Sequence, residues 1–402
     1  TREGDDVKLL ADATIEGMPA NRLKQYWPPF VARGAHKWVT ENITSGQVPK
    51  ASAQARLRVP LANPAHPHVD AITGSMQLKD ITVNYLRPLP PVTKAQGYAS
   101  FDQSSFNITV ESGELVQPGT NAIKLTGATI NLSGFTDNTD RADIELTTSG
   151  TLASQLQLLD HDRLGYPRRL GLKSAEAKGQ AEVTARFQFP LVKDLLMDQV
   201  AVSAGAKMRQ VALPRLVAGQ DMTDGQLELK LDGGGMTITG TSKIGPAPVQ
   251  MEWTETFVDD VSPSSEIRFT GSMDEAARQA FNVSWPEVVA DAVDVAGYYS
   301  KERGKSATLD VQMDFSKATL ALPWFGWHKP VGEKASGSAR VTIGKQQVEA
   351  IPAFSLDGAG AKVIGKVSFA AGSRWQKVTL DRLNVPGSDL RGDITNRGEA
   401  GL

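Results

Sequence analysis

Cysteine is absent from this chain of 402 residues. A chain without cysteine forms no disulfide bonds, holds no thiolate-bound metal and has no cysteine nucleophile. The redox compartment stays open, because a cysteine-free chain is compatible with an oxidising compartment without requiring one.

Long hydrophobic runs are also missing. The longest apolar stretch, near 288–297, is interrupted by Asp291 and Asp294, whereas a membrane-spanning helix needs about 20 largely apolar residues. No signal peptide is visible, and the chain begins at Thr1 rather than at methionine. We therefore expect a piece of a longer protein whose targeting segment lies outside this sequence.

Neither sign of charge dominates, since 43 Lys and Arg stand against 45 Asp and Glu. A broad basic surface for nucleic acid is therefore not expected, and the adjacent Arg168 and Arg169 are interpreted as solvated surface. Aromatic residues make up only 6% of the chain, whereas glycine occurs 37 times. This combination is typical of many strands joined by tight turns.

Alternation of apolar and polar residues with a period of two is the main pattern present. It occurs at 51–59, 106–110, 181–189, 227–231, 236–239, 249–254 and 309–315. Successive side chains of a strand point to opposite faces, so this pattern predicts antiparallel sheet with one dry and one wet face. We count roughly fifteen strand candidates, more than the ten or so that an open sheet usually holds without curling or splitting. The dry face must then close on itself, pack on a second layer, or line a groove.

Two turns support this interpretation. The sequences 232–235 and 302–305 each separate two alternating segments and predict hairpins. The segment 293–301 fits a helix or a strand, and the neighbouring turn favours the strand.

Helices are predicted in few places. Pro19 suits the first turn of a helix that runs to about Trp27, and a second helix is predicted over 30–42. The sequence 272–275 matches a capping box that precedes a helix over 276–281. A short helical turn is predicted at 191–197.

Motifs that carry chemistry are weak. His66 and His68 form the only close histidine pair, without a third ligand at a useful spacing, so a loop is favoured over a metal site. His161 lies between Asp160 and Asp162 without an accompanying nucleophile, which favours a polar turn. No phosphate-binding loop, nucleophile elbow or zinc-protease motif is found. We therefore expect no catalytic residue, no metal and no cofactor.

Several weak motifs in a set order carry a family resemblance. The segment 190–257, with Asp224-Gly225, Gly240 and the ending Trp-Thr-Glu-Thr-Phe, resembles the AsmA-like domain of YhdP-type proteins, which are relatives of TamB. The segment 38–46 is similar to the entry helix and first long strand of that family. The segments 85–91 and 322–329 are similar to a proline-marked strand end and to a late segment of the family.

This resemblance implies a fold and a function. The fold would be mainly β, with a long, curled antiparallel sheet that forms an elongated apolar groove, and with a few short helices. It would comprise an N-terminal helical entry segment at 1–45, a first β-groove section at 46–175 and an AsmA-like second section at 176–402. Such proteins are anchored in the bacterial inner membrane by an N-terminal helix, which is missing from this sequence. They span the periplasm and pass phospholipids toward the outer membrane, where outer-membrane or periplasmic proteins are potential partners.

The apolar residues of the alternating strands are the candidates for a lipid-binding groove. They are Val183, Phe187, Phe189, Leu227, Leu229, Leu231, Met236, Ile238, Val249, Met251, Trp253, Leu309, Val311, Met313, Phe315, Val363, Val367 and Phe369. Each of them taken singly fits core packing better than a groove. The main alternative for the whole chain is a structural β-protein of the cell envelope with a closed core. A carbohydrate-active enzyme is disfavoured, because no carboxylate pair adjoins the aromatic group of Trp324 and Trp327.

Overall fold

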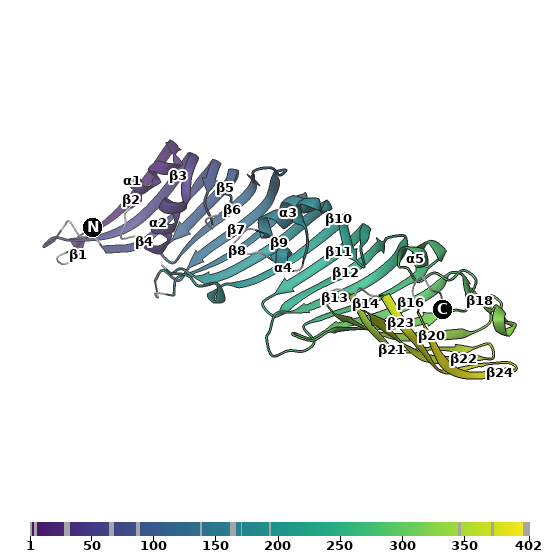
Figure 1. The fold of residues 1–402 in the computed structure, drawn as a ribbon. Coiled ribbons are helices and arrows are strands. Elements are labelled where there is room, and N and C mark those ends of the chain that lie inside the picture. Colours follow the sequence, from purple (N-terminus) through teal and green to yellow (C-terminus); the bar gives the residue numbers. More distant parts are fainter. Residues whose placement is uncertain are drawn as a thin grey trace. The chain divides into compact units, whose positions relative to one another are not determined.

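The computed structural model describes residues 2–3, 6–27, 33–63, 68–85, 89–136, 139–160, 166–169, 171–192, 194–344, 347–370 and 374–396. The chain divides into two compact units. Unit 1 comprises 1–175 and 179–206, and unit 2 comprises 176–178 and 207–402. Strands dominate both units (Figure 1).

Unit 1 is an antiparallel meander in which each strand pairs with the next along the chain. Its strands are β1 (Arg2–Glu3), β2 (Asp6–Pro19), β3 (Ile43–Pro60), β4 (His68–Val83), β5 (Val92–Asp102), β6 (Ser105–Leu115), β7 (Ile123–Ser133), β8 (Arg141–Thr151) and β9 (Lys178–Pro190). Its helical elements are η1 (Ala20–Arg22), α1 (Leu23–Tyr26), α2 (Arg33–Asn42), α3 (Leu152–Leu159), α4 (Tyr166–Arg169) and η3 (Met197–Gln199).

Unit 2 continues the same principle with hairpin-connected strands. Strand β10 (Ala201–Val217) begins in unit 1 and ends in unit 2. The strands that follow are β11 (Gln220–Asp232), β12 (Gly235–Ile244), β13 (Ala247–Thr256), β14 (Ser265–Met273), β16 (Val293–Lys301), β17 (Ala307–Asp314), β20 (Ala335–Gly344), β21 (Gln347–Gly358), β22 (Ala361–Ala370), β23 (Arg374–Val385) and β24 (Ser388–Thr395). A separate small sheet contains β15 (Val289–Asp291), β18 (Ala318–Leu322) and β19 (Trp327–Lys329). The short helical elements of unit 2 are α5 (Glu275–Ala280) and η4 (Pro323–Phe325), while η2 (Ser174–Glu176) begins in unit 1 and ends in unit 2.

The predicted fold class, mainly β with long antiparallel sheet and few short helices, is confirmed. The hairpins at 232–235 and 302–305 are present, and 293–301 is strand β16. The number of strands was underestimated, since the described residues contain 24. Strand β20 begins with the sequence Ala-Ser-Gly-Ser-Ala-Arg, and small residues of this kind weaken the apolar alternation.

Several predicted helix boundaries are wrong. Pro19 ends strand β2 instead of lying in a helix, so the segment 1–45 contains a long strand as well as helices. The cap of α5 is Asp274 rather than Ser272, because the Asp274 carboxylate accepts the backbone N–H of Ala277 at 2.8 Å while Ser272 belongs to β14. The turn predicted at 191–197 is displaced to η3. The predicted helix over 30–42 is present from Arg33 onward, and its earlier residues lie outside the described ones.

The curling predicted for the sheet is not confirmed. Curvature in antiparallel sheets is produced mainly by β-bulges. The pairings from β12 through β13, β14, β16 and β17 to β20 run without a register shift. This stretch therefore lacks the bulges that would bend it most strongly.

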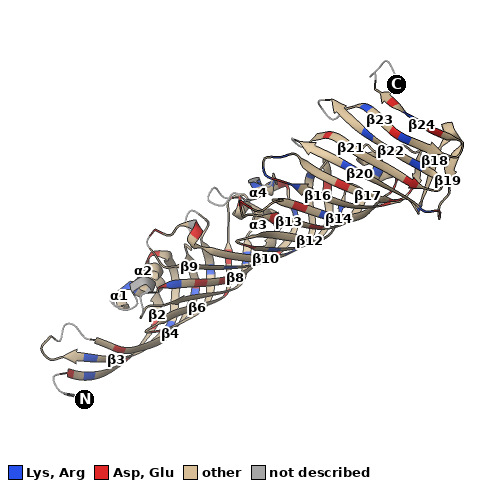
Figure 2. Ribbon diagram, turned by 90° about the horizontal axis from the view of Figure 1, so that it is seen from below, with Lys and Arg blue, Asp and Glu red and all other residues tan. Residues whose placement is uncertain are grey.

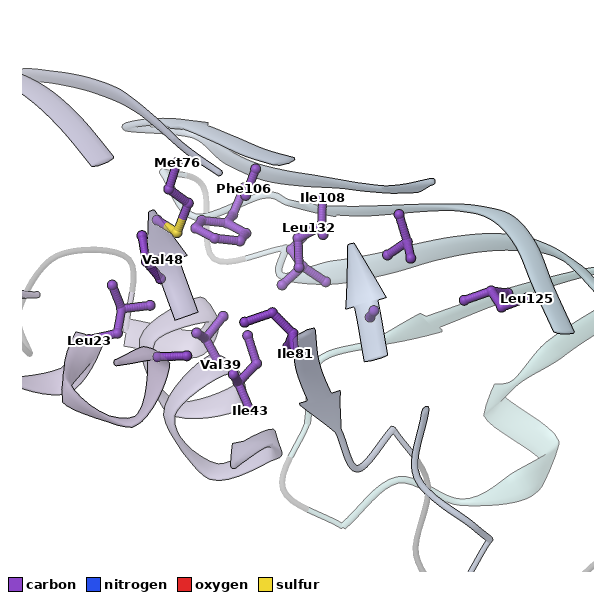
Figure 3. Packing of buried hydrophobic residues seen from close by; sticks show 14 of the residues in the cluster. Leu23, Val39, Ile43, Val48, Met76, Ile81, Phe106, Ile108, Leu125 and Leu132 are labelled. Atoms are coloured by element: carbon purple, nitrogen blue, oxygen red, sulfur yellow. The ribbon is translucent and has the colours of Figure 1, made fainter. Parts of the chain in front are cut away.

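In unit 1, helices cover part of the apolar face. Val39 of α2 is 1% exposed and packs in one cluster with Met76, Ile81 and Phe106 of the sheet (Figure 3). The Trp27 ring stacks on Phe106 with a centroid distance of 5.2 Å. This end of the sheet therefore has a closed core.

In unit 2, the small sheet covers one margin of the apolar face. Leu320 of β18 and Trp327 of β19 pack in one buried cluster with Val293 and Phe315. The fully buried Lys329 ammonium donates to the carbonyls of Phe315 at 2.8 Å and Ala318 at 2.7 Å. Backbone carbonyls thus satisfy a buried charge and tie the small sheet to the end of β17.

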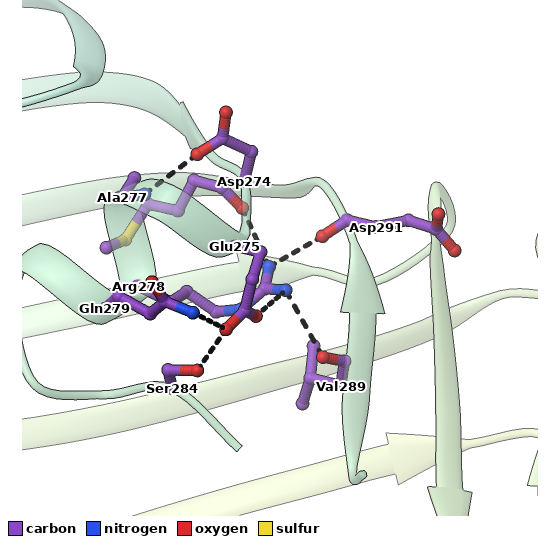
Figure 4. A network of polar contacts seen from close by, with 9 residues as sticks. Asp274, Glu275, Ala277, Arg278, Gln279, Ser284, Val289 and Asp291 are labelled. Carbon is purple, nitrogen blue, oxygen red and sulfur yellow. Dashed lines mark hydrogen bonds and ion pairs between the residues drawn. The ribbon is translucent and has the colours of Figure 1, made fainter. Parts of the chain in front are cut away.

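Arg278 of α5 holds a second part of that margin together. Its side chain is 6% exposed, and its guanidinium pairs with Glu275 at 2.9 Å. It also donates to the carbonyls of Met273 at 3.0 Å, Asp291 at 2.6 Å and Val289 at 3.2 Å (Figure 4). One side chain therefore joins α5 to β14 and β15.

We expect Arg278→Met to destabilise unit 2 by about 2–4 kcal/mol, because buried carbonyls lose their donor. Gln279→Met is the matched control, since Gln279 is the next residue on α5 and is exposed. Thermal melts of the two variants measure the difference. Equal melting temperatures would show that the Arg278 contacts contribute no net stability.

Candidate functional site

The apolar side chains of unit 2 form cross-strand rows on one face. Residues directly opposite in an antiparallel pair share a face, and one row, here called the central row, can be followed across eleven strands. The central row consists of Leu227, Gly240, Met251, Phe269, Gly297, Val311, Ala339, Phe354, Gly365, Leu380 and Gly392. Its members carry no charge, so it is an uninterrupted apolar line.

Two further apolar rows flank the central row. The core-side row, next to the small sheet, consists of Val249, Gly271, Val295, Met313, Gly337, Leu356, Val363, Leu383 and Leu390. The outer row consists of Leu229, Ile238, Trp253, Ile267, Tyr299, Leu309 and Val341. Together the three rows make an apolar face several side chains wide.

Polar residues begin beyond the outer row. Glu255, Ser265 and Lys301 lie opposite one another on β13, β14 and β16. The Trp253 indole N–H lies 3.2 Å from the Glu255 carboxylate and 3.1 Å from the Ser265 hydroxyl. Burial, and then the nearby Glu255 charge, raise the pKa of Tyr299. Amphipathic aromatic side chains thus mark the boundary between apolar and polar surface.

The reverse face of the same strands is charged. Arg340 binds Asp310 at 2.6 Å, and Arg268 lies 5.1 Å from the Tyr298 ring centre. The Arg340 guanidinium donates a hydrogen bond to the Asp310 carboxylate and is attracted by its negative charge. In that order of size, these two interactions raise the pKa of Arg340. Figure 2 shows acidic and basic residues on strands of both units. A shallow depression of about 700 Å³, lined largely by these polar side chains, belongs to this charged surface.

Partial exposure distinguishes the apolar face from a closed core. Most of the predicted groove residues of unit 2 are half-buried: Leu229, Leu231, Ile238, Val249, Met251, Trp253, Leu309, Val311, Met313, Val367 and Phe369. Leu227, Met236, Phe315 and Val363 are buried. Phe315 follows β17 and belongs to the core under the small sheet. The structure therefore brings the candidates of unit 2 to one face, while their role in lipid binding stays a prediction.

The three candidates of unit 1 share a face with its core. Phe187 lies opposite Ile144, Phe189 opposite Ala142 and Val183 opposite Thr148. All three are half-buried. They lie at β9, seven strands along the meander from β2, whereas Val39 and Trp27 cover residues of β4 to β6.

Groups suited to catalysis or metal binding do not gather on this face. Among the described residues, no three His, Cys, Asp or Glu side chains are arranged to hold a metal ion. His66 and His161 lie outside the described residues, and His68 is the first residue of β4. None of the helices in the described ranges has the length and apolar character needed to cross a bilayer.

Comparison with models of protein families shows to which family the chain belongs. A family model described as YhdP protein matches residues 5–385. The chain belongs to the YhdP family. No curated protein and no solved structure matches the chain. The resemblance inferred from weak motifs is therefore confirmed over nearly the whole sequence, and YhdP membership is the context for the apolar face.

Sequence reasoning missed part of the apolar face. Ile267, Phe269 and Tyr299 lie in the middle of the rows but were not among the candidates. Ile267, Phe269, Gly271 and Met273 alternate with polar residues, so the signal was present. Glycine interrupts this alternation of apolar and polar residues, because it has no apolar side chain. A glycine opposite a large residue nevertheless forms part of the apolar face.

Proposed function

We propose that this YhdP-family chain binds phospholipids on its apolar face and passes them along its sheets between the inner and outer bacterial membranes. The half-buried state of most residues in the three apolar rows of unit 2 carries the proposal. A closed core of this size would bury its central Met, Phe and Val residues fully, whereas Met251, Phe269 and Val311 are all half-buried.

The energetics favour an acyl chain as the occupant. Each methylene group removed from water contributes about 0.8 kcal/mol, so a sixteen-carbon tail gains roughly 12 kcal/mol on full burial. Because hydrophobic contact is non-directional, a tail can slide along the rows without breaking a specific bond at each step. Such a function requires no catalytic residue.

The polarity of the two margins orients the lipid. The core-side margin is covered by the small sheet, while Glu255, Ser265 and Lys301 lie at the opposite margin, beyond Trp253 and Tyr299. The tails then point toward the small sheet and the headgroup faces solvent at the polar margin. The proposed partners are phospholipid, the inner membrane, and outer-membrane or periplasmic proteins, and the proposed location is the periplasm.

A closed structural β-protein is the second candidate. The helix-covered cluster around Val39 and Phe106 in unit 1 favours it, since that part of the face is already occupied by protein.

Mass spectrometry of an organic extract of the natively purified protein tests the proposal. We expect phospholipid in near-stoichiometric amounts, above that found with a soluble control protein. A clean extract after mild purification would favour the closed structural β-protein.

A further inference from the structure

The central row of unit 2 combines large residues with the smallest ones. Gly240, Gly297, Gly365 and Gly392 belong to it, and so does Ala339. Glycine inside a strand weakens the strand and often marks a bulge, a bend or the close approach of another group. Two of these glycines have a phenylalanine directly opposite: Phe269 faces Gly297 and Phe354 faces Gly365.

The Phe269 ring lies across Gly297. A Cβ atom added to Gly297 would come within 2.1 Å of Phe269 Cζ and 2.3 Å of Cε1. Such a short distance means that the ring leans along the row and occupies the space of the missing side chain. The Gly297 position is therefore explained by the space that this ring requires.

The second pair repeats the arrangement. A Cβ atom on Gly365 would lie 2.7 Å from Phe354 Cζ and 2.9 Å from Cε1. Both rings follow the direction of the row, which crosses the strands. The largest side chains of the central row therefore add little height above the sheet.

The flanking rows are bulkier and set the width of the resulting trough. Same-face residues of one strand are two positions apart, about 6.7 Å, so the backbones of the outer and core-side rows are roughly 13 Å apart. Trp253, Ile267 and Tyr299 stand on one side of the trough, and Val295, Met313 and Leu356 on the other. None of these side chains is charged, whereas Glu252, Arg268 and Asp310 carry charges on the reverse face.

We propose that Gly297 and Gly365 are positioning residues of the apolar face, which act through the rings of Phe269 and Phe354, and that the central row is the track along which a lipid acyl chain lies. The inference rests on the proposed function. By letting Phe269 and Phe354 lie flat, the two glycines keep the track low and continuous. An uncharged trough matches an uncharged hydrocarbon chain, and its direction is that of transport along the sheet.

Gly297→Ala tests the inference more cleanly than Gly365→Ala does. At Gly297 the three atoms nearest the added methyl group all belong to the far end of the Phe269 ring, which can rotate away. At Gly365 the nearest atom is the Thr379 carbonyl oxygen at 2.5 Å, which belongs to the backbone. The Gly297→Ala variant should fold, but its Phe269 ring should rotate away from the sheet and block the track. Gly233→Ala is the matched control, because it adds the same methyl group in the 232–235 turn, outside the three rows, with no atom within 4 Å.

Fluorescence titration with NBD-labelled phosphatidylcholine, accompanied by thermal melts, tests the inference. We expect affinity to fall about tenfold in Gly297→Ala, the size of effect that one misplaced methylene has in an apolar pocket. Gly233→Ala should bind as the unaltered protein does. Adding Phe269→Ala to Gly297→Ala should restore binding, because the obstructing ring is removed.

The outcomes separate the two proposals. An unaltered protein that binds no labelled lipid overturns the proposed function. An unaltered protein that binds, together with a Gly297→Ala variant of equal affinity, overturns the track alone. A loss that the Phe269→Ala change does not reverse also overturns the track, since the effect would then have come from the backbone.

Discussion

Val311→Asp is expected to abolish lipid binding while the protein stays folded. Val311 is half-buried at the centre of the apolar face, with Gly297 and Ala339 opposite it. These small neighbours leave a new carboxylate accessible to water in the lipid-free protein. Against an acyl chain the carboxylate costs about 3 kcal/mol or more, so affinity should fall at least about a hundredfold.

Gln312→Asp is the control for this variant. It introduces the same charge one residue further along β17, on the exposed reverse face, and should bind lipid normally. Titration with labelled phosphatidylcholine and thermal melts measure both properties. If Val311→Asp unfolds the protein, Val311 belongs to a closed core and the face is not open at this position.

Phe106→Ala is expected to cause the largest loss of stability. The side chain is 2% exposed and stacks against Trp27 under the helices of unit 1. Removing a ring from such a site costs about 3–5 kcal/mol, a large share of the roughly 5–15 kcal/mol that stabilises a typical domain. Unit 1 should melt many degrees lower, with a loss of amide protection in β5–β7 measured by hydrogen exchange.

Phe269→Ala is the matched comparison on the open face of unit 2. Because Phe269 is half-buried, its truncation should cost only about 1–1.5 kcal/mol. The contrast between the two phenylalanines measures the difference between a covered and an uncovered apolar face. Similar losses for both variants would show that protein covers the unit 2 face as fully as it covers Phe106.

The period-two pattern was sufficient to predict the fold class. In segments such as 181–189 and 227–231 the apolar residues alternate strictly, and both segments lie in strands with those residues on one face. This inference is reliable because the alternation of side chains is a property of a single strand. Turn chemistry at 232–235 and the choice of a strand at 293–301 were likewise local decisions.

Helix ends were less accessible to sequence reasoning. Ser272 and Asp274 are both good capping residues, and the choice between them depends on where β14 ends. That strand runs to Met273 because it pairs with β16. A partner far along the chain thus decided a boundary that the local sequence left open.

The sequence by itself determined that this chain is a mainly β protein with one apolar face, and its motifs indicated the YhdP family. Only the tertiary structure decided which parts of that face are covered. The helices bury Phe106, the small sheet buries Phe315, and Val311 is left half-exposed, although all three belong to alternating segments of the same kind. Alternation records which side of a strand a residue faces, whereas coverage depends on elements that arrive from elsewhere in the chain.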